Sequence, residues 1–155
     1  MAGRKQFSTF VVDCLLFGVE VEKVQEVIRY QEMTRVPLAP PVVKGLINLR
    51  GQIVTAVDLR RRLGLRERAS TDLPMNVVIR HEDGAVSLLV DEIGDVLEVE
   101  EENFELPPGT LDSKARDLIR GIYKLSDRLM HVLDTGAAVS VAGEGQAKTA
   151  KVSGP

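Results

Sequence analysis

The feature that most constrains the fold is a succession of short apolar runs, rich in valine and isoleucine, that turn residues interrupt at close intervals. Runs of about four to eight such residues, bounded by Gly, Asp or Pro, predict β-strands. They occupy residues 7–21, 42–59, 75–99 and 119–133. Many short strands with few helices predict an all-β sandwich or barrel.

Short helices are expected at two places. Val21, Val24, Val27 and Ile28 recur at spacings of three and four, which predicts a short amphipathic helix. Residues 60–65 predict one helical turn. Between these two segments, the prolines of residues 34–41 lack amide donors and predict an extended connector.

The chain is expected to form one domain over residues 7–138, with two halves. A polar linker at residues 66–74 separates halves of roughly 7–70 and 75–138. Gly84 and the polar residues 126–128 predict two hairpins in the second half, whereas Asp13 and Gly18 interrupt the strands of the first. Small and polar residues dominate 139–155, which predicts a disordered tail.

Charge and composition make several classes of partner improbable. The net charge of -3 gives no general attraction to nucleic acid or to an anionic membrane, and the absence of Trp leaves few rings for stacking bases. No apolar stretch approaches the roughly 20 residues that span a bilayer, and no signal peptide is evident. Cys14 is the only cysteine, which agrees with a reducing compartment. We therefore expect a cytoplasmic protein without metal or other cofactor.

Two weaker hypotheses remain open at this point. An enzyme would need Cys14, His131 and Asp134 to converge in space. A nucleic-acid-binding barrel would use the arginines of residues 60–68, which we interpret instead as a solvated helix end. The carboxylates of residues 91–105 lack the spacing of a calcium loop and predict a solvated acidic face.

A long ordered pattern in the first half resembles the CheW domain family of bacterial chemotaxis. It comprises Lys23-Val24-Gln25-Glu26-Val27, Arg35-Val36-Pro37, Lys44-Gly45-Leu46-Ile47-Asn48-Leu49-Arg50-Gly51 and Ile53-Val54-Thr55-Ala56-Val57-Asp58-Leu59-Arg60. In the second half, Val90-Asp91 with Ile93, and Asp127-Arg128-Leu129-Met130, also match. An ordered match of this length is far more specific than a lone glycine motif.

The resemblance implies a fold of two SH3-like five-stranded β-barrels packed on a shared hydrophobic core. It further implies a non-catalytic adaptor that binds the regulatory domain of a CheA-type histidine kinase and the cytoplasmic tips of methyl-accepting chemotaxis receptors. Such a protein is recruited from the cytoplasm to membrane receptor arrays without inserting into the membrane. The alternative is a CheW-like scaffold of a chemosensory pathway with a non-flagellar output.

The residues expected to bind partners or to support coupling all lie in this pattern. They are Val24, Glu26, Val27, Gly45, Asn48, Arg50, Gly51, Asp58 and Arg60. The family resemblance associates Glu26 and Arg50 with coupling. An ion pair between them would orient the expected helix against the strand turn and so affect binding indirectly, or the two side chains would contact a partner directly. Asp58 is expected to cap the following turn. The apolar tip at residues 13–16 departs from the family and predicts a partner-facing patch or an altered hairpin register.

Overall fold

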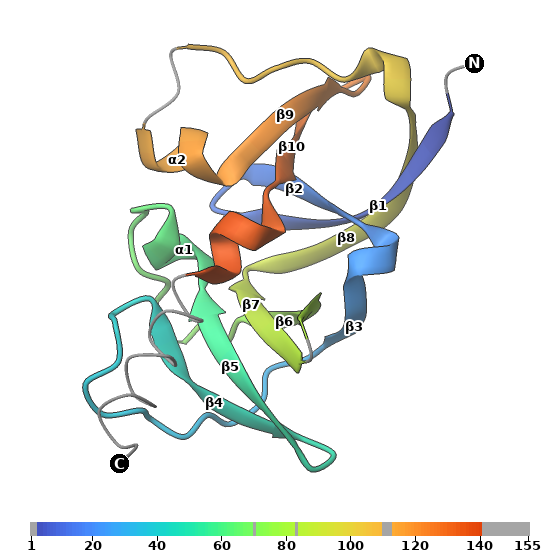
Figure 1. Cartoon of the computed structure of the whole chain (residues 1–155). Helices are drawn as coiled ribbons and strands as arrows, with labels where there is room; N and C mark the ends of the chain where they lie inside the picture. Colours follow the sequence, from blue (N-terminus) through green and yellow to red (C-terminus); the bar gives the residue numbers. More distant parts are fainter. Residues whose placement is uncertain (1–2, 70, 83, 110–112, 141–155) are drawn as a thin grey trace.

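The computed structural model describes residues 3–69, 71–82, 84–109 and 113–140, which form two five-stranded sheets and a few short helices (Figure 1). The strands are β1 (Arg4–Val12), β2 (Leu15–Glu20), β3 (Val24–Ile28), β4 (Val43–Leu49), β5 (Gln52–Asp58), β6 (Met75–His81), β7 (Gly84–Val90), β8 (Glu92–Glu100), β9 (Ile119–Lys124) and β10 (Leu129–Leu133). The helices are η1 (Val21–Lys23), α1 (Leu59–Arg62), η2 (Glu101–Asn103) and α2 (Ser113–Leu118), and residues 135–140 are also helical. The all-β class is confirmed, although each sheet is open.

Strand order shows that the two sheets do not correspond to the two halves of the chain. The first sheet has the order β8-β1-β2-β10-β9, and the second has the order β3-β6-β7-β5-β4. Each sheet therefore combines a hairpin from one half with three strands from the other. The sheets therefore do not follow the expected halves at residues 7–70 and 75–138, because pairing between distant strands leaves no mark in local sequence patterns.

The two halves nevertheless repeat one another. Each supplies a hairpin and then three further strands, with one parallel pair in each sheet, β2 with β10 and β5 with β7. In the second sheet Gly45 pairs with Ala56, and in the first sheet Gly121 pairs with Val132, each beside a register shift. The structure is a duplicated five-strand unit whose two copies have exchanged hairpins.

In each sheet, one isolated bridge connects the segment that follows one edge strand with the other edge strand, although continuous strand pairing does not close the sheet into a barrel within the described residues. Thr34, which follows β3, forms two backbone hydrogen bonds of 2.8 Å with Leu46 on β4. Glu105, which follows β8, bonds in the same way to Ile122 on β9, at 2.9 and 2.7 Å. The residue before each bridge on β4 and β9 is glycine, because a Cβ there would collide with the opposing backbone.

A shared hydrophobic core joins the sheets, as expected. It contains Phe10 and Phe17 from the first sheet and Val57 and Leu88 from the second, all fully buried. Each sheet also encloses a smaller apolar cluster of its own. Burial of this much aliphatic and aromatic surface provides the main stabilisation of the fold.

The helix expected over Val21–Ile28 is wrong beyond its first turn. Only η1 is helical, and β3 follows as an edge strand of the second sheet. A bulge between Val24 and Glu26 shifts the alternation of side chains, so the strand carries a pattern that resembles helical spacing.

Three further expectations need correction. The predicted tail begins too early, because residues 135–140 are helical and Val139 is buried; residues 141–155 lie outside the described part of the chain. Gly18 does not interrupt a strand but lies within β2, against the Met130 side chain. At the tip of residues 13–16 the altered register is wrong, because Asp13 and Cys14 at positive φ form a two-residue turn in regular register; a partner-facing patch there stays a prediction.

Candidate functional site

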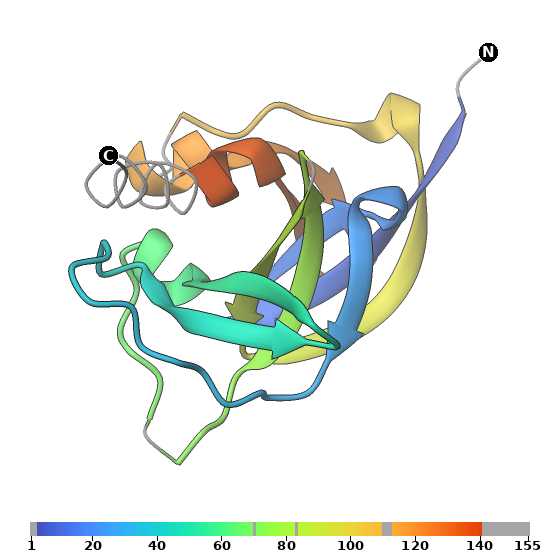
Figure 2. The same ribbon diagram turned by 60° about the horizontal axis from the view of Figure 1, so that its bottom comes forward.

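The β4–β5 hairpin carries most of the sequence-predicted coupling residues and reaches β3 at the opposite edge of its sheet (Figure 2). Its two turn residues, Arg50 and Gly51, have φ of 51° and 91°, as a two-residue hairpin with the twist of its strands requires. The Asn48 side chain accepts a hydrogen bond of 2.9 Å from the Gly51 amide. Asn48 therefore fixes the turn that presents Arg50.

The expected ion pair between Glu26 and Arg50 is present. The Arg50 guanidinium donates to the Glu26 carboxylate, which is 18% exposed, whereas the Arg50 side chain is 75% exposed. Beside this pair, the Gln25 amide donates to Gln52 at 3.5 Å. The pair orients the hairpin against a strand rather than against the expected helix, and it leaves one side of the guanidinium open to a partner.

Apolar side chains flank the pair. Val27 is 37% exposed and Ile53 is 61% exposed, while Val24 is half-buried against the shared core. Gly45 lies behind this surface, where a Cβ would come within 2.8 Å of the Thr34 carbonyl oxygen. The hairpin surface thus combines a salt bridge with exposed apolar groups, a composition suited to protein contacts.

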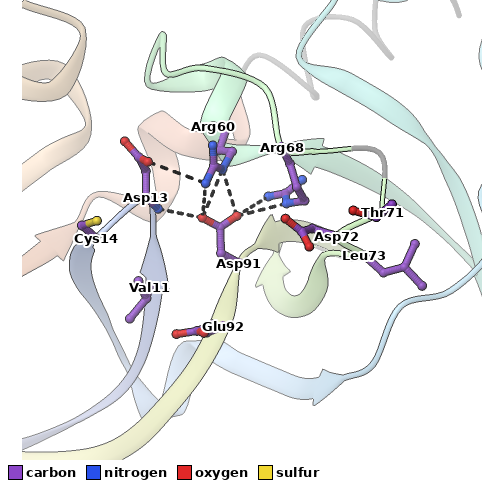
Figure 3. A pocket seen from close by; sticks show the side chains of 10 residues that line it. All are labelled: Val11, Asp13, Cys14, Arg60, Arg68, Thr71, Asp72, Leu73, Asp91 and Glu92. Carbon is purple, nitrogen blue, oxygen red and sulfur yellow. Dashed lines mark hydrogen bonds and ion pairs between the residues drawn. The ribbon is translucent and has the colours of Figure 1, made fainter.

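A second cluster forms where the chain crosses from β7 to β8, and sequence analysis did not detect it. Asp91 accepts hydrogen bonds of 2.7–3.1 Å from the Arg60 guanidinium and of 2.8 and 3.0 Å from the Arg68 guanidinium (Figure 3). The backbone amide of Asp13 donates to the same carboxylate at 2.7 Å. We call these four residues the Asp91 cluster.

The Asp91 cluster connects both sheets. Asp13 belongs to the β1–β2 turn of the first sheet, Arg60 to α1 after β5 of the second, and Arg68 to the linker between the halves. Burial raises the pKa of Asp91, but hydrogen bonds from Arg60, from the Asp13 amide and from Arg68 outweigh this and lower it to about 2. Asp91 is therefore ionised at any physiological pH.

Asp58 confirms its expected role as a helix cap. Its carboxylate accepts a hydrogen bond of 3.1 Å from the Arg60 amide at the start of α1. Only 5% of its side chain is exposed, and Arg61 and Arg68 lie within 3.8 and 3.9 Å. The helical segment 135–140 repeats the arrangement, because the Asp134 carboxylate accepts from the Ala137 amide at 3.1 Å.

Replacing Asp58 with alanine is expected to lower the free energy of unfolding by about 1–2 kcal/mol, because the partly buried Arg60 amide at the start of α1 loses its acceptor. Urea denaturation at pH 7 measures the change. Asn is as good a cap as Asp, so Asp58→Asn is the matched control and should lose less than half as much. Equal losses in the two variants would show that charge, rather than capping, accounts for the contribution.

The arginines of residues 60–68 are largely paired within the protein. Arg60 and Arg68 bind Asp91, and Arg61 lies 2.6 Å from Glu67. These contacts neutralise three of the five arginines that a nucleic-acid-binding barrel would use. The interpretation of residue 91 as part of a solvated acidic face is wrong, since only 18% of its side chain is exposed.

The residues of the enzyme hypothesis have separate structural partners. Cys14 is exposed in the β1–β2 turn, the His131 Nδ1 lies 3.0 Å from the Leu16 carbonyl oxygen, and Asp134 caps a helix. Within the described residues, no group of three or more His, Cys, Asp or Glu side chains could hold a metal ion. In that same part of the chain, no helix is both long and apolar enough to cross a bilayer.

Comparisons with known proteins agree on one family. A model of the CheW-like domain matches residues 6–142. The chemotaxis protein CheW of Bacillus subtilis is 34% identical over 130 residues, covering 84% of this chain and 83% of the relative. The chemotaxis protein CheW of Thermotoga maritima is 30% identical over 126 residues, covering 81% and 82%.

A solved structure supports the same conclusion at the level of the fold. The crystal structure of the scaffolding protein TtCheW from Thermoanaerobacter tengcongensis superimposes with a TM-score of 0.76 at 28% sequence identity. The match covers 85% of this chain and 90% of that chain. The fold of this chain is therefore similar to that of a protein named as a scaffolding protein.

Proposed function

Because the chain belongs to the family of CheW-like domains, we propose that it is a non-catalytic adaptor that couples a CheA-type histidine kinase to methyl-accepting chemotaxis receptors. The observation that carries the proposal is the exposed Arg50 guanidinium, which pairs with Glu26; β3 and β5, the strands on either side of this contact, also carry the exposed Val27 and Ile53. In this proposal the protein resides in the cytoplasm and reaches the membrane only through the receptors that it binds.

The regulatory domain of the kinase is proposed to contact the β4–β5 hairpin. Arginine presents five donors in a rigid fork and is enriched at the energetic centres of protein interfaces. Arg50 keeps donors available, because the described Glu26 contact engages only its Nη2 atom. Exposed Ile53 follows the turn and would supply apolar area beside the guanidinium.

The receptor tip is proposed to dock along the edge strands. Val27 on β3 and Val96 on β8 occupy equivalent places in the two repeats, and they are 37% and 57% exposed. Exposed valines on edge strands are apolar groups of the kind that an amphipathic helix can cover. Val24, half-buried against the shared core, would form the floor of that contact.

Calorimetric titration with the regulatory domain of the CheA kinase from the same genome tests the kinase contact. We expect saturable binding at micromolar concentrations, and Arg50→Ala should weaken it about tenfold or more, as for a central interface arginine. Gln52→Ala, which alters a neighbouring side chain of the same hairpin, is the matched control and should bind almost normally. Failure to bind with both partners folded would overturn the proposal for this kinase.

A charge-reversal cycle tests whether the Glu26–Arg50 pair supports coupling. Glu26→Arg and Arg50→Glu should each weaken kinase binding by about tenfold, because each places like charges at the contact between strand and turn. The double variant restores opposite charges and should recover part of the affinity. Simple additivity of the two losses in the same titration would remove the pair from the explanation.

A further inference from the structure

β3 lies at the edge of the second sheet beside β6 (Figure 1), and a β-bulge interrupts its pairing. Val24 pairs with Ile79 of β6 and Val27 pairs with Val77, so three positions along β3 match two positions along β6. Gln25 is the extra residue, and because of it Val24 and Val27 lie on the same face of β3, opposite two residues of the shared core.

The bulge brings two consecutive side chains to the same neighbour. The Gln25 amide donates to the Gln52 side-chain oxygen at 3.5 Å, and the Glu26 carboxylate accepts from the Arg50 guanidinium. Both contacts reach the β4–β5 hairpin, although consecutive side chains of a regular strand point to opposite faces. The register of β3 therefore determines whether the Glu26–Arg50 pair can form.

The edge strand of the first sheet repeats the bulge. Ile93 pairs with Phe10 of β1 and Val96 pairs with Ser8, so three positions along β8 again match two positions along the neighbouring strand. The exposed Val96 follows this bulge as the exposed Val27 follows the other. Because both copies of the five-strand unit contain the bulge at the same place, it is a feature of the unit and not a local irregularity of β3.

Side chains of the neighbouring strand bind the backbone at each bulge. In the second sheet the Arg80 Nη1 atom donates hydrogen bonds of 2.9 and 2.8 Å to the carbonyl oxygens of Glu22 and Val24, directly before the extra residue. In the first sheet the Thr9 hydroxyl donates to the Asp95 carbonyl oxygen at 2.5 Å. A bulge disrupts the backbone ladder locally, so these side-chain donors stabilise the backbone where pairing is interrupted.

A second residue of β6 holds the other end of β3. The buried Asn76 amide donates to the Arg29 carbonyl oxygen at 3.0 Å, and its oxygen accepts a hydrogen bond of 2.8 Å from the buried Ser87 hydroxyl. Asn76 and Arg80 are four positions apart on β6, whereas the carbonyl groups that they bind, on Arg29 and Val24, are five positions apart. The extra residue is therefore enclosed between two fixed points. We call Asn76 and Arg80 the β6 anchors.

We propose that the β6 anchors, Asn76 and Arg80, are positioning residues that keep β3 in the register needed for coupling. The inference rests on the proposed function, since it assigns the anchors a part in presenting its contacts. If residues 26–28 slipped by one position, Glu26 would face the shared core instead of the β4–β5 hairpin, and Val27 would turn to the opposite face. Such a slip would break the bond from Asn76 to Arg29, and a slip of the preceding residues would break the bonds of Arg80.

Amide hydrogen exchange tests the anchors in the absence of any partner. Arg80→Ala should speed exchange of the β3 amides about tenfold, because the chain loses two hydrogen bonds directly before the bulge. Arg80→Lys keeps one charged donor and should restore part of the protection. Arg120→Ala, which removes an exposed arginine from β9, is the matched control and should leave β3 unchanged. Equal exchange of β3 in Arg80→Ala and Arg120→Ala would overturn the proposal.

Titration with the kinase regulatory domain tests whether Asn76 acts on coupling through Arg50. Ser87→Ala keeps the bond from Asn76 to Arg29, whereas Ser87→Ala combined with Asn76→Val removes it without leaving an unpaired hydroxyl. The combined variant should bind the kinase about fivefold more weakly than Ser87→Ala, with urea midpoints showing that both remain folded. In an Arg50→Ala background the same comparison should show no further loss, because a residue that acts through the Glu26–Arg50 pair has no effect once the pair is gone.

Failure of the function and failure of the inference give different results. If the native protein does not bind the kinase, the proposed function fails, and exchange of the β3 amides still decides whether the anchors fix the strand. If the kinase binds and the loss caused by Asn76→Val is the same with and without Arg50, Asn76 stabilises the fold alone and the proposal is overturned.

Discussion

Replacing Asp91 with alanine is expected to lower the free energy of unfolding at pH 7 by about 3 kcal/mol, the typical cost of leaving buried cations without their partner. The side chains of Arg60 and Arg68 are only 14% and 9% exposed, and both would lose their carboxylate partner. The Asp13 amide would lose its acceptor as well. Chemical denaturation provides the measurement.

Glu92 offers a control next to Asp91 in sequence. Its side chain is exposed, so Glu92→Ala should change stability by less than about 0.5 kcal/mol. If Asp91→Ala were equally mild, water would have to replace the carboxylate around both arginines. The Asp91 cluster would then be a surface feature rather than the connection between the sheets.

The dependence of stability on pH should also show the contribution of the ionised Asp91 carboxylate. The pKa of Asp91 is about 2 in the folded state, against an ordinary value of 3.8, so the ionised form contributes stability that is fully present well above pH 3.8. That contribution, about 2 kcal/mol for a shift of this size, is lost as the pH falls through 2. The stability difference between the native protein and Asp91→Asn should therefore narrow between pH 4 and pH 2. A constant difference would mean that the pKa of Asp91 is not lowered by folding.

The largest expected effect from a single added methyl group is at Gly121. A Cβ at this position would collide with the Phe104 ring and lie 2.6 Å from the Glu105 carbonyl oxygen. The ring is 39% exposed and can move, but the carbonyl belongs to the bridge that joins the edges of the first sheet. Gly121→Ala should therefore cost about 3 kcal/mol, at the upper end for overpacking.

Gly45→Ala tests whether the second sheet needs glycine at its bridge for the same reason, because the added Cβ would lie 2.8 Å from the Thr34 carbonyl oxygen at the equivalent bridge. A loss of about 2–3 kcal/mol is expected there. Gly84→Ala is the control, since no atom lies within 4 Å of the added Cβ. Urea denaturation of the three variants compares them. If all three behaved alike, close approach at the bridges would not explain the two glycines.

Much of the strand pattern could be predicted from the sequence, because hairpins leave local signals. The β9–β10 hairpin was expected at residues 119–133 and forms there with small differences at its ends. β3 was predicted to be a helix because the bulge at Gln25 adds one residue to the strand, so that Val24 and Val27 are three positions apart in sequence, as they would be on one face of a helix. The exchange of hairpins between the halves could not be predicted, since no local pattern records which distant strand a hairpin joins.

Part of the candidate site could likewise be predicted from the sequence, and part could not. Glu26 and Arg50 were identified through family resemblance, and the ion pair between them is confirmed. Asp91 matched the family pattern but was interpreted as part of a solvated acidic face because it stands in an acidic stretch, although it follows directly after the buried strand β7. The Arg60 and Arg68 side chains point to it only after folding, so their pairing required the three-dimensional structure.

The exchange of hairpins has a consequence for synthesis on the ribosome. The β1–β2 hairpin emerges first, but its sheet needs β8, β9 and β10, and β10 ends at Leu133. The second sheet needs β6 and β7 from the later half, so the first half completes neither sheet. A nascent chain therefore cannot complete either sheet during the synthesis of its first half, and it completes the first sheet only when almost all of the described residues have been made. A premature stop before β10 would leave the shared core exposed and strands of the first half without their partners. Any truncated chain of this kind would therefore be recognised as unfolded, and the whole domain is accepted or degraded as one unit.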